Sequence, residues 1–284
     1  MKIRLPALLV LGCVMALGCA APDDQGESKV SMIPPIAAKQ AHEIEAHGDV
    51  RVDDYYWLRE RDNPEVIAYL EAENEFTEAA LAHTEALQEK LYEEIVGRIQ
   101  QDDDSVPYRK NDYFYYSRYR EGDEYPRYCR KKGSLDAAEE VMIDANREAE
   151  GHEFFTMWGV DVSPDGKTMA YAIDTVGRRF HTLRFRDLET GEDLPDVIDN
   201  VTYVGEWAND SKTYLYTKQD PETLRWQRIY KHVLGTDPAT DELVYEESDE
   251  EFNVFVFKSR SEDYLMIGAS QTLSSEFWYL DANN

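Results

Sequence analysis

Two histidines near the N-terminus have the residue types of a zinc site but not its spacing. His42 and His47 flank Glu43 and Glu45 in the run HEIEAH. The zinc pattern of metalloproteases places its histidines four residues apart, on one face of a helix, with the glutamate as general base. A spacing of five residues would turn the two imidazoles about 140° apart on a helix. The sequence therefore predicts no metal site here.

Hydrolysis of an acyl bond would need a serine beside a histidine base, together with an oxyanion hole. Ser163, Ser211 and Ser261 lie in or beside predicted turns, where a hydroxyl serves the backbone well. The nearest candidate bases are His152 and His181, and nothing in the pattern aims them at these serines. The sequence also contains no G-x-S-x-G nucleophile elbow. We therefore assign no catalytic residue within this chain.

The remaining candidates for reactive chemistry are predicted to be structural. Cys129 lies on a predicted strand without a histidine close in sequence, which favours an inert thiol. Asp102-Asp103-Asp104 lies in a predicted solvated loop, Gln100–Ser105, and consecutive residues cannot all converge on one ion. The glycine-rich phosphate-binding patterns are absent, so we expect no nucleotide cofactor and no metal. Structural roles are also expected for the histidines that occur singly in strands or turns: His152, His181 and His232.

The stretch Gly151–Gly191 shows how these residues are arranged in the chain. It contains three predicted strands: Gly159–Ser163, Lys167–Asp174 and Phe180–Leu188. Each alternates apolar and polar residues, the period of a strand with one buried face. Pro164-Asp165-Gly166 is a turn, because proline presets φ and glycine accepts a positive φ. The stretch therefore predicts an antiparallel meander, the unit of a propeller blade.

This unit repeats along the chain. Equivalent turn residues, Asp165 and Asp210 or Gly191 and Gly235, are about 45 residues apart, the period of a four-stranded propeller blade. A β-sandwich also has strands at short intervals, but the repeated turn chemistry favours the propeller. The other predicted strands are Asp112–Tyr119, Tyr125–Lys131, Glu140–Asp144, Tyr203–Trp207, Lys212–Thr217, Gln227–Leu234, Phe252–Lys258, Tyr264–Ser270 and Glu276–Leu280.

Two helices are predicted before the repeats, in an extended and helical arm over residues 36–106. Asn63-Pro64-Glu65 is a helix start, with Asn63 as the N-cap. Thr84 can cap a second helix. The apolar stripe of that helix should lie on another surface and consists of Leu87, Leu91, Ile95 and Ile99. The repeats then occupy residues 107–284.

The composition restricts the classes of partner. The 284 residues are 42% hydrophobic and carry a formal net charge of −28. Such acidity argues against nucleic acid and anionic lipid surfaces as partners. It fits either solubility, including life in a salty habitat, or the attraction of cationic substrates.

The N-terminus resembles a bacterial lipoprotein leader. Residues 1–19 have a positive start with Lys2 and Arg4, an apolar run Leu5–Leu17, and a lipobox-like end, Ala16-Leu17-Gly18-Cys19. We expect acylation of Cys19, a flexible tether over residues 20–35, and a lipid anchor on the periplasmic side of the cell envelope. The alternative is an ordinary signal peptide cut near Ala21, which gives a soluble periplasmic protein. After processing at Cys19 only Cys129 remains, so no intrachain disulfide is expected.

Several runs carry a resemblance to a known family. DYYWLR at 54–59, followed by NPEV at 63–66, resembles the N-terminal signature of the prolyl oligopeptidase family of serine peptidases. The likeness runs from about Pro34 to the end. The runs that are similar to the oligopeptidase B branch are EVMIDAN at 140–146, GHEFF at 151–155, RR at 178–179, LRFRDLETG at 183–191, WANDS at 207–211, GT at 235–236 and DELVYEE at 241–247.

The resemblance implies a seven-bladed propeller that caps an α/β-hydrolase domain carrying a Ser, Asp and His triad. It implies cleavage of short peptides after Arg or Lys, with the propeller restricting access to oligopeptides. The sequence stops at Asn284, inside about the fourth blade, so we expect the hydrolase domain to be absent from this chain. The expected fold is mainly β: a helical arm followed by three to four blades of a partial propeller.

Two functions follow from this fold. The first is the propeller portion of a serine oligopeptidase, inactive alone, whose partners are the oligopeptide substrate and the missing hydrolase domain. In that protein the helices before residue 100 could brace the hydrolase domain. The second is a non-catalytic envelope lipoprotein whose β repeats bind a protein or peptide. Open sheet edges should make the chain prone to self-association in either case.

Overall fold

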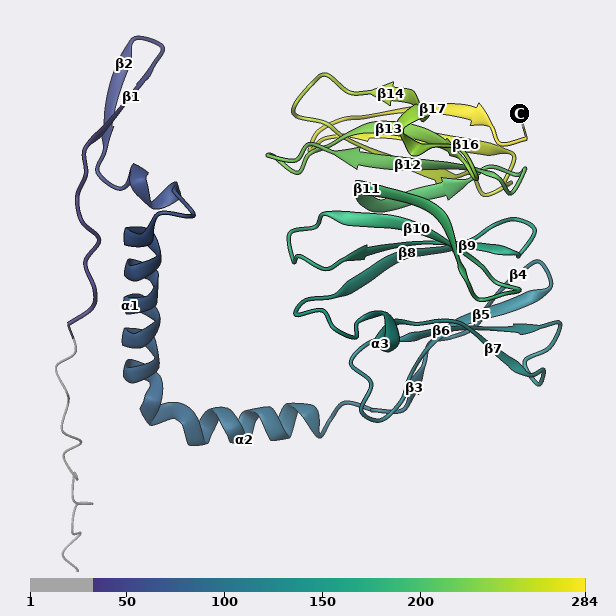
Figure 1. Cartoon of the computed structure of the whole chain (residues 1–284), viewed down its shortest axis with the longest axis horizontal. Helices are drawn as coiled ribbons and strands as arrows, with labels where there is room; N and C mark the ends of the chain where they lie inside the picture. The colour runs from purple at the N-terminus through teal and green to yellow at the C-terminus, as the bar shows by residue number, and fades with distance from the viewer. Residues whose placement is uncertain (1–32, 284) are drawn as a thin grey trace, which may run out of the picture. The chain divides into compact units, whose positions relative to one another are not determined.

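The computed structural model describes residues 33–283, so the predicted leader with Cys19 and most of the predicted tether lie outside the described residues. The chain separates into two compact units, the first ending at Arg98 and the second beginning at Ile99. Helices dominate the first unit and strands the second, as predicted (Figure 1). Between residues 33 and 283, no helix is both long and apolar enough to span a bilayer.

The run HEIEAH forms a strand of a β-hairpin that the sequence did not predict. β1 (His42–Ala46) pairs antiparallel with β2 (Asp49–Asp53). His47-Gly48 makes the two-residue turn, with φ values of 54° and 79°, and such left-handed turns match the twist of the flanking strands. The ring of His42 stacks on Tyr56 with centroids 3.8 Å apart. The two histidines therefore take separate positions, one on a strand and one in a turn.

A short helical turn holds the end of the hairpin against the first helix. The 3₁₀ turn η1 (Tyr56–Arg59) buries Trp57, whose Nε1 donates a hydrogen bond to the carbonyl oxygen of Ala38 at 2.9 Å. Val66, from the first turn of the next helix, is also buried. Trp57 and Val66 are thus the buried apolar side chains of the described part of this unit.

The first helix begins where the sequence predicts. In α1 (Pro64–Leu81), the side chain of Asn63 accepts a hydrogen bond from the Glu65 amide at 2.9 Å. Pro64 occupies the first helical position, where its missing N–H would have no partner in any case. The predicted Asn63 cap is therefore confirmed.

The second helix begins without the predicted side-chain cap. Thr84 closes the 3₁₀ turn η2 (Ala82–Thr84) and precedes α2 (Glu85–Val96), but its hydroxyl donates to the Leu81 carbonyl at 2.7 Å. The continuous helical path from α1 leaves Thr84 in a helical conformation, so its oxygen does not reach the first amides of α2. The predicted apolar stripe is solvent-exposed: Leu87, Leu91, Ile95 and Ile99.

Four successive antiparallel blades make up the second unit (Figure 1). The first contains β3 (Asp103–Asp104), β4 (Tyr108–Lys110), β5 (Tyr113–Tyr119), β6 (Arg127–Lys132) and β7 (Glu139–Asp144), followed by α3 (Ala145–Glu148). The second contains β8 (Thr156–Val162), β9 (Thr168–Asp174), β10 (His181–Asp187) and the first half of β11 (Asp193–Trp207). The third contains the second half of β11, β12 (Thr213–Gln219), β13 (Trp226–Val233), η3 (Pro238–Thr240) and β14 (Glu242–Glu246). The fourth contains β15 (Asn253–Lys258), β16 (Tyr264–Ser270) and β17 (Ser275–Asp281).

One long strand joins the second and third blades. β11 is 15 residues long; it pairs with β10 up to Val201 and with β12 from Val201 onward. The sequence predicted only the half that begins at Tyr203, because Pro195 and four acidic or amide residues obscure the alternation in the first half. A second correction concerns Asp103-Asp104, which pairs with β5 as β3 instead of lying in a loop.

The core lies between neighbouring blades, as the propeller prediction requires. Alternate residues of each strand face the blade before or after it, and most of these residues are apolar. The first interface includes Tyr115, Ile143, Phe155, Met157, Met169 and Tyr171. The second includes Phe185, Val201, Trp207 and Tyr214, and the third includes Leu215, Ile229, Val254, Val256 and Ile267.

Hydrogen bonds also link the first turn of each blade to the next blade. Asn111 Nδ2 donates to the Pro164 carbonyl at 2.9 Å, and the Asp165 amide donates to Ser211 Oγ at 3.1 Å. Asn209 Nδ2 donates to the Glu262 carbonyl at 2.9 Å. We call this end of the second unit the turn rim. The predicted turn residues thus set the registry between blades as well as closing their own strands.

Candidate functional site

The opposite end of the second unit holds its best candidate for contact with a partner. Here the first strand of each blade begins and the second strand connects to the third; we call it the loop rim. The strand registers place Asp103 opposite Tyr119, Thr156 opposite Asp174, and Val201 opposite Lys218 at this end. Side chains far apart in sequence therefore meet along one edge of the blades.

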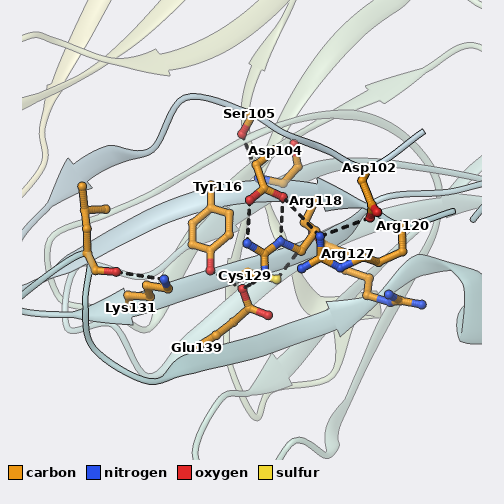
Figure 2. Close-up of polar contacts among 12 residues, drawn as sticks. Asp102, Asp104, Ser105, Tyr116, Arg118, Arg120, Arg127, Cys129, Lys131 and Glu139 are labelled. Carbon is orange, nitrogen blue, oxygen red and sulfur yellow. Dashed lines mark hydrogen bonds and ion pairs between the residues drawn. The ribbon is translucent and has the colours of Figure 1, made fainter. Parts of the chain in front are cut away.

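On the first blade, an ion-pair cluster extends from the loop rim across the outer face of the blade (Figure 2). Arg118 makes a two-pronged contact with Asp104, at 2.6 Å from Nε and 2.5 Å from Nη2. Its remaining nitrogen Nη1 donates a hydrogen bond to Glu139, which also accepts a hydrogen bond from the Tyr116 hydroxyl. The guanidinium lies over the Tyr116 ring, 5.3 Å from its centroid. Three strands of the blade are thereby tied together by one arginine.

The cluster controls the protonation of its members. The hydrogen bond from Arg118 holds the pKa of Asp104 below its ordinary value, so this carboxylate stays charged. Burial, and then the hydrogen bond to Glu139, raises the pKa of Tyr116. Cys129 lies beneath the cluster on β6, as predicted, and is fully buried. Burial raises the pKa of its thiol to about 11, so it remains protonated and unreactive.

The second and third blades carry a run of aromatic side chains at the loop rim, two of them exposed and one half-buried. The rings of Trp158 and Tyr203 have centroids 6.0 Å apart, and those of Tyr203 and Trp226 are 5.6 Å apart. Trp158 is 56% exposed and Tyr203 is 43% exposed. Large aromatic surfaces exposed together are typical of binding sites, because they bury much area at little cost in rotamer entropy.

Backbone geometry supports this aromatic run. Gly159 has a φ of 63°, and a Cβ at this position would lie 2.4 Å from the Tyr203 carbonyl oxygen. Only glycine allows β8 to approach β11 so closely. The approach places Trp158 and Tyr203 side by side, although they are on different blades.

The adjoining loop is held in one conformation by a carboxylate. Asp174 accepts backbone hydrogen bonds from Val176, Gly177 and Arg179 at 2.7–3.0 Å. Gln219 of the third blade donates to the Arg179 carbonyl at 2.7 Å. The loop therefore forms a fixed wall next to the aromatic run.

The family can now be identified from comparison with known proteins. Residues 34–284 match the family model described as the prolyl oligopeptidase N-terminal beta-propeller domain. The chain belongs to the prolyl oligopeptidase family. The predicted family and fold are therefore confirmed.

Named relatives agree with this placement. The chain is 42% identical over 264 residues to a dipeptidyl aminopeptidase BI from Pseudoxanthomonas mexicana, covering 87% of this chain and 36% of that protein. It is 37% identical to a protease 2 from Moraxella lacunata, covering 88% of this chain and 37% of that protein. The solved oligopeptidase B from Leishmania major superimposes with a TM-score of 0.82 at 30% identity, covering 88% of this chain and 38% of that one. The chain thus spans little more than a third of these relatives.

The serines considered as nucleophiles occupy structural positions in this family member. Ser163 Oγ donates to Asp165 Oδ1 at 2.7 Å, and Ser211 Oγ accepts the Asp165 amide. Ser261 Oγ lies 3.2 Å from Ser259 Oγ within its own turn. None of these hydroxyls bonds to a histidine within residues 33–283, so the structure does not bring the candidate nucleophiles and bases together.

The histidines likewise have structural partners. His152 stacks near Phe155, and the His181 ring contacts the Arg179 carbonyl at 3.2 Å. Burial lowers the pKa of His181, which keeps it neutral. In the described part of the chain, no group of three His, Cys, Asp or Glu side chains is arranged to hold a metal.

His232 is the most deeply placed of them. It is fully buried, and its two ring nitrogens lie 2.9 Å from Asp196 Oδ1 and 2.8 Å from Asp241 Oδ1. The Gly235 amide and the Tyr216 hydroxyl donate to the same two carboxylates. This network ties β11 to β13 and to the residue after η3, in agreement with the structural role predicted for His232.

Proposed function

We propose that this chain is the propeller portion of a serine oligopeptidase of the oligopeptidase B type, which hydrolyses short peptides after Arg or Lys. The observation that carries the proposal is the superposition of its successive blades on the oligopeptidase B propeller, together with the family match. In this proposal the propeller limits access to oligopeptides and contributes no nucleophile. The triad belongs to a hydrolase domain beyond the matched third of the relatives.

The loop rim is the surface of this propeller that receives the peptide. Trp158 and Tyr203 offer exposed aromatic faces beside a fixed loop, and the half-buried Trp226 extends the run. Guanidinium groups stack well on such faces, and the net charge of −28 attracts cationic peptides over longer distances. The rim thus fits a peptide that carries Arg or Lys, while the choice of the cleaved bond lies with the hydrolase domain.

The first unit has a complementary role. Its exposed stripe of Leu87, Leu91 and Ile95 on α2 is an apolar helix face of the kind that packs on another surface. We assign that surface to the hydrolase domain, so the arm braces the catalytic half of the protein. A lipid on Cys19 anchors the enzyme on the periplasmic side of the envelope. Mass spectrometry of the mature N-terminal peptide tests the anchor, and an unmodified start at Ala20 or later contradicts it.

A paired activity assay tests the function. This chain should give no labelling by a fluorophosphonate probe and no cleavage of fluorogenic peptides ending in Arg or Lys. A longer chain in which this propeller is followed by a hydrolase domain should give both. Labelling of a serine within residues 33–283 contradicts the proposal. So does an extended chain that binds such peptides without hydrolysing them, which is the outcome expected of a non-catalytic binding lipoprotein.

A further inference from the structure

Four charged side chains form a line across the four blades, close to the turn rim. Lys110 on β4 lies 3.7 Å from Asp161 on β8, measured from Nζ to Oδ1. Lys258 on β15 lies 3.8 Å from Glu206 on β11, measured from Nζ to Oε1. Each of the four stands at or near the end of the first strand of its blade, just before the first turn. We call them the first-strand quartet.

The quartet lies where neighbouring blades come closest. β8 and β11 are in contact, as are β11 and β15, and Lys110 also donates to the Val162 carbonyl at 3.4 Å. The indole of Trp207 donates to the backbone oxygen of Asp161 at 3.2 Å, which fixes the second blade against the third at this point. The two carboxylates are therefore on facing strands of adjacent blades, each with one lysine on its outer side.

Asp161 is the unusual member. Its side chain retains only 25% exposure, and its Oδ2 atom is buried without any hydrogen-bond partner. A buried carboxylate oxygen with no donor is costly as long as it carries charge. Lys110 compensates in part, but it contacts only Oδ1 and shares its ammonium group with Val162. The free oxygen is well suited to hold a proton.

Electrostatics points in the same direction. Burial, and then repulsion by Glu206, raises the pKa of Asp161 to about 7, against the attraction of Lys110. Burial also raises the pKa of Glu206, against the attraction of Lys258. The other titratable groups near Asp161 are Tyr108 and Tyr214, and burial raises the pKa of both, so they stay neutral. Besides burial, the charged groups that influence the pKa of Asp161 are therefore Glu206 and the two lysines.

We propose that the first-strand quartet is a proton-operated fastening between blades: uptake of one proton by Asp161 releases Lys110 and removes this one ion pair from the contact between the first and second blades. With Asp161 ionised, the chain of contacts from Lys110 to Lys258 spans all four blades. With Asp161 protonated, the repulsion between the two carboxylates disappears and the Lys110 contact loses its charge. Glu206 keeps Lys258 in both states, so the change is confined to the contact between the first and second blades.

Carboxylate-selective carbon NMR on the full chain, from pH 5 to pH 9, tests this directly. The Asp161 signal should titrate near neutral pH, well above an ordinary aspartate. Lys110→Met should move its midpoint up by about one pH unit, because an opposite charge within 4 Å has been removed. Lys231→Met is the matched control, since Lys231 pairs with the exposed Glu242 on the outer strands of the third blade. It should leave the Asp161 midpoint unchanged.

A double-mutant cycle measures the fastening itself. The coupling between Lys110→Met and Asp161→Asn in the unfolding equilibrium should be present at pH 8.5 and absent at pH 5.5. Both substitutions are close in shape to the native side chains, and the NMR titration of the native chain needs neither of them. A midpoint for Asp161 near 4 overturns the proposal, and so does a coupling of equal size at both pH values.

Discussion

The outer faces of the first and fourth blades are built from similar strands, yet their apolar side chains differ in solvent exposure. On the first blade, Tyr116 and Cys129 point away from the second blade and are nevertheless buried. They are covered by Arg118 and Glu139, which close over them as an ion-paired lid (Figure 2). On the fourth blade the corresponding side chains form aromatic pairs around the half-buried Phe255, and four of them remain exposed: Phe257, Phe277, Tyr264 and Tyr279.

The comparison shows how the apolar side chains of a solvent-facing sheet can be kept from water. The first face satisfies its charges with one another and shields its apolar atoms under the arginine plane. The fourth face has no such lid, and Phe277 and Tyr279 keep 52% and 69% of their surface exposed. A contiguous apolar patch of this kind marks an association surface, and the strand β17 beside it offers an unpaired edge within the described residues.

Removing the lid should have the largest effect. Arg118→Met leaves Glu139 without a cation and Asp104 with only the more distant Arg120, so the free energy of unfolding should fall by about 2 kcal/mol. Urea denaturation measures it. Arg228→Met is the control, because its pair with Glu246 on the third blade is exposed and such pairs contribute about 0.5 kcal/mol. Equal losses in the two variants would show that the lid does not hold the first face.

The fourth face should govern self-association. Phe277→Arg combined with Tyr279→Arg places like charges on the aromatic patch, and the association constant should fall by about tenfold, or 1.4 kcal/mol. Sedimentation and binding of an environment-sensitive dye measure the change. Leu135→Arg, in the exposed β6–β7 loop, is the control for added charge alone. Equal association of the double variant and the control contradicts the assignment of this face.

The two carboxylates Asp104 and Asp161 should respond to pH with opposite signs. The pKa of Asp104 is lowered by Arg118, so its contribution to stability is present above the ordinary value and is lost as the pH falls through the lowered pKa. The pKa of Asp161 is raised to about 7, so the folded state binds the extra proton and stability falls as the pH rises toward and through 7.

Stability profiles of two variants separate these effects. Asp161→Asn should remove the decline between pH 5 and pH 8 and should leave the loss below pH 4 in place. Asp104→Asn should lower stability at neutral pH and reduce the loss below pH 4. Thermal unfolding across pH 3–9 gives both profiles. A native profile that rises steadily from pH 5 to pH 8, and that Asp161→Asn does not alter, would remove the basis of the sign assigned to Asp161.

The repeated turns explain why so much of the fold could be predicted. Asp165 and Asp210 are local signals, since their side chains bond to backbone amides two or three residues away. The first half of β11 was missed because charged residues and Pro195 hide its alternation, whereas the hairpin at His42 was missed although Ile44, Val50 and Val52 alternate with charged residues. The conformation of such strands depends on the strands with which they pair. β11 pairs with β10 and β12, and its own sequence does not predict these partners.

The candidate site was less predictable for the same reason. Trp158, Tyr203 and Trp226 are each ordinary strand residues in the sequence, and only the close approach at Gly159 brings the first two together. The alternation of apolar and polar residues predicted the strands that carry these side chains. It did not predict which strands would lie next to them. Asp161 and Glu206 could not be recognised either, because a charged residue in an alternating strand is expected to face water. Burial at a blade interface depends on the turn between blades, which no short pattern encodes.

The smallest expected effect tests how the lid is built. Lys131 lies over the outer side of Tyr116, with Nζ 5.9 Å from the ring centroid, and Lys132 lies 5.7 Å from Tyr113 on the opposite face. Exposed contacts of this kind contribute about 0.5 kcal/mol. Lys131→Met and Lys132→Met should therefore each cost about that amount by urea denaturation.

The two lysines should differ once the arginine is gone. In the Arg118→Met background, Lys131 is the remaining cation over Tyr116, so Lys131→Met should cost more than it does in the native chain. Lys132→Met should cost the same in both backgrounds, because its ring faces the second blade and is not part of the lid. Additive losses for Lys131 would show that the first face is covered by independent contacts; a coupling for Lys131 alone would show that the cations over Tyr116 act as one lid.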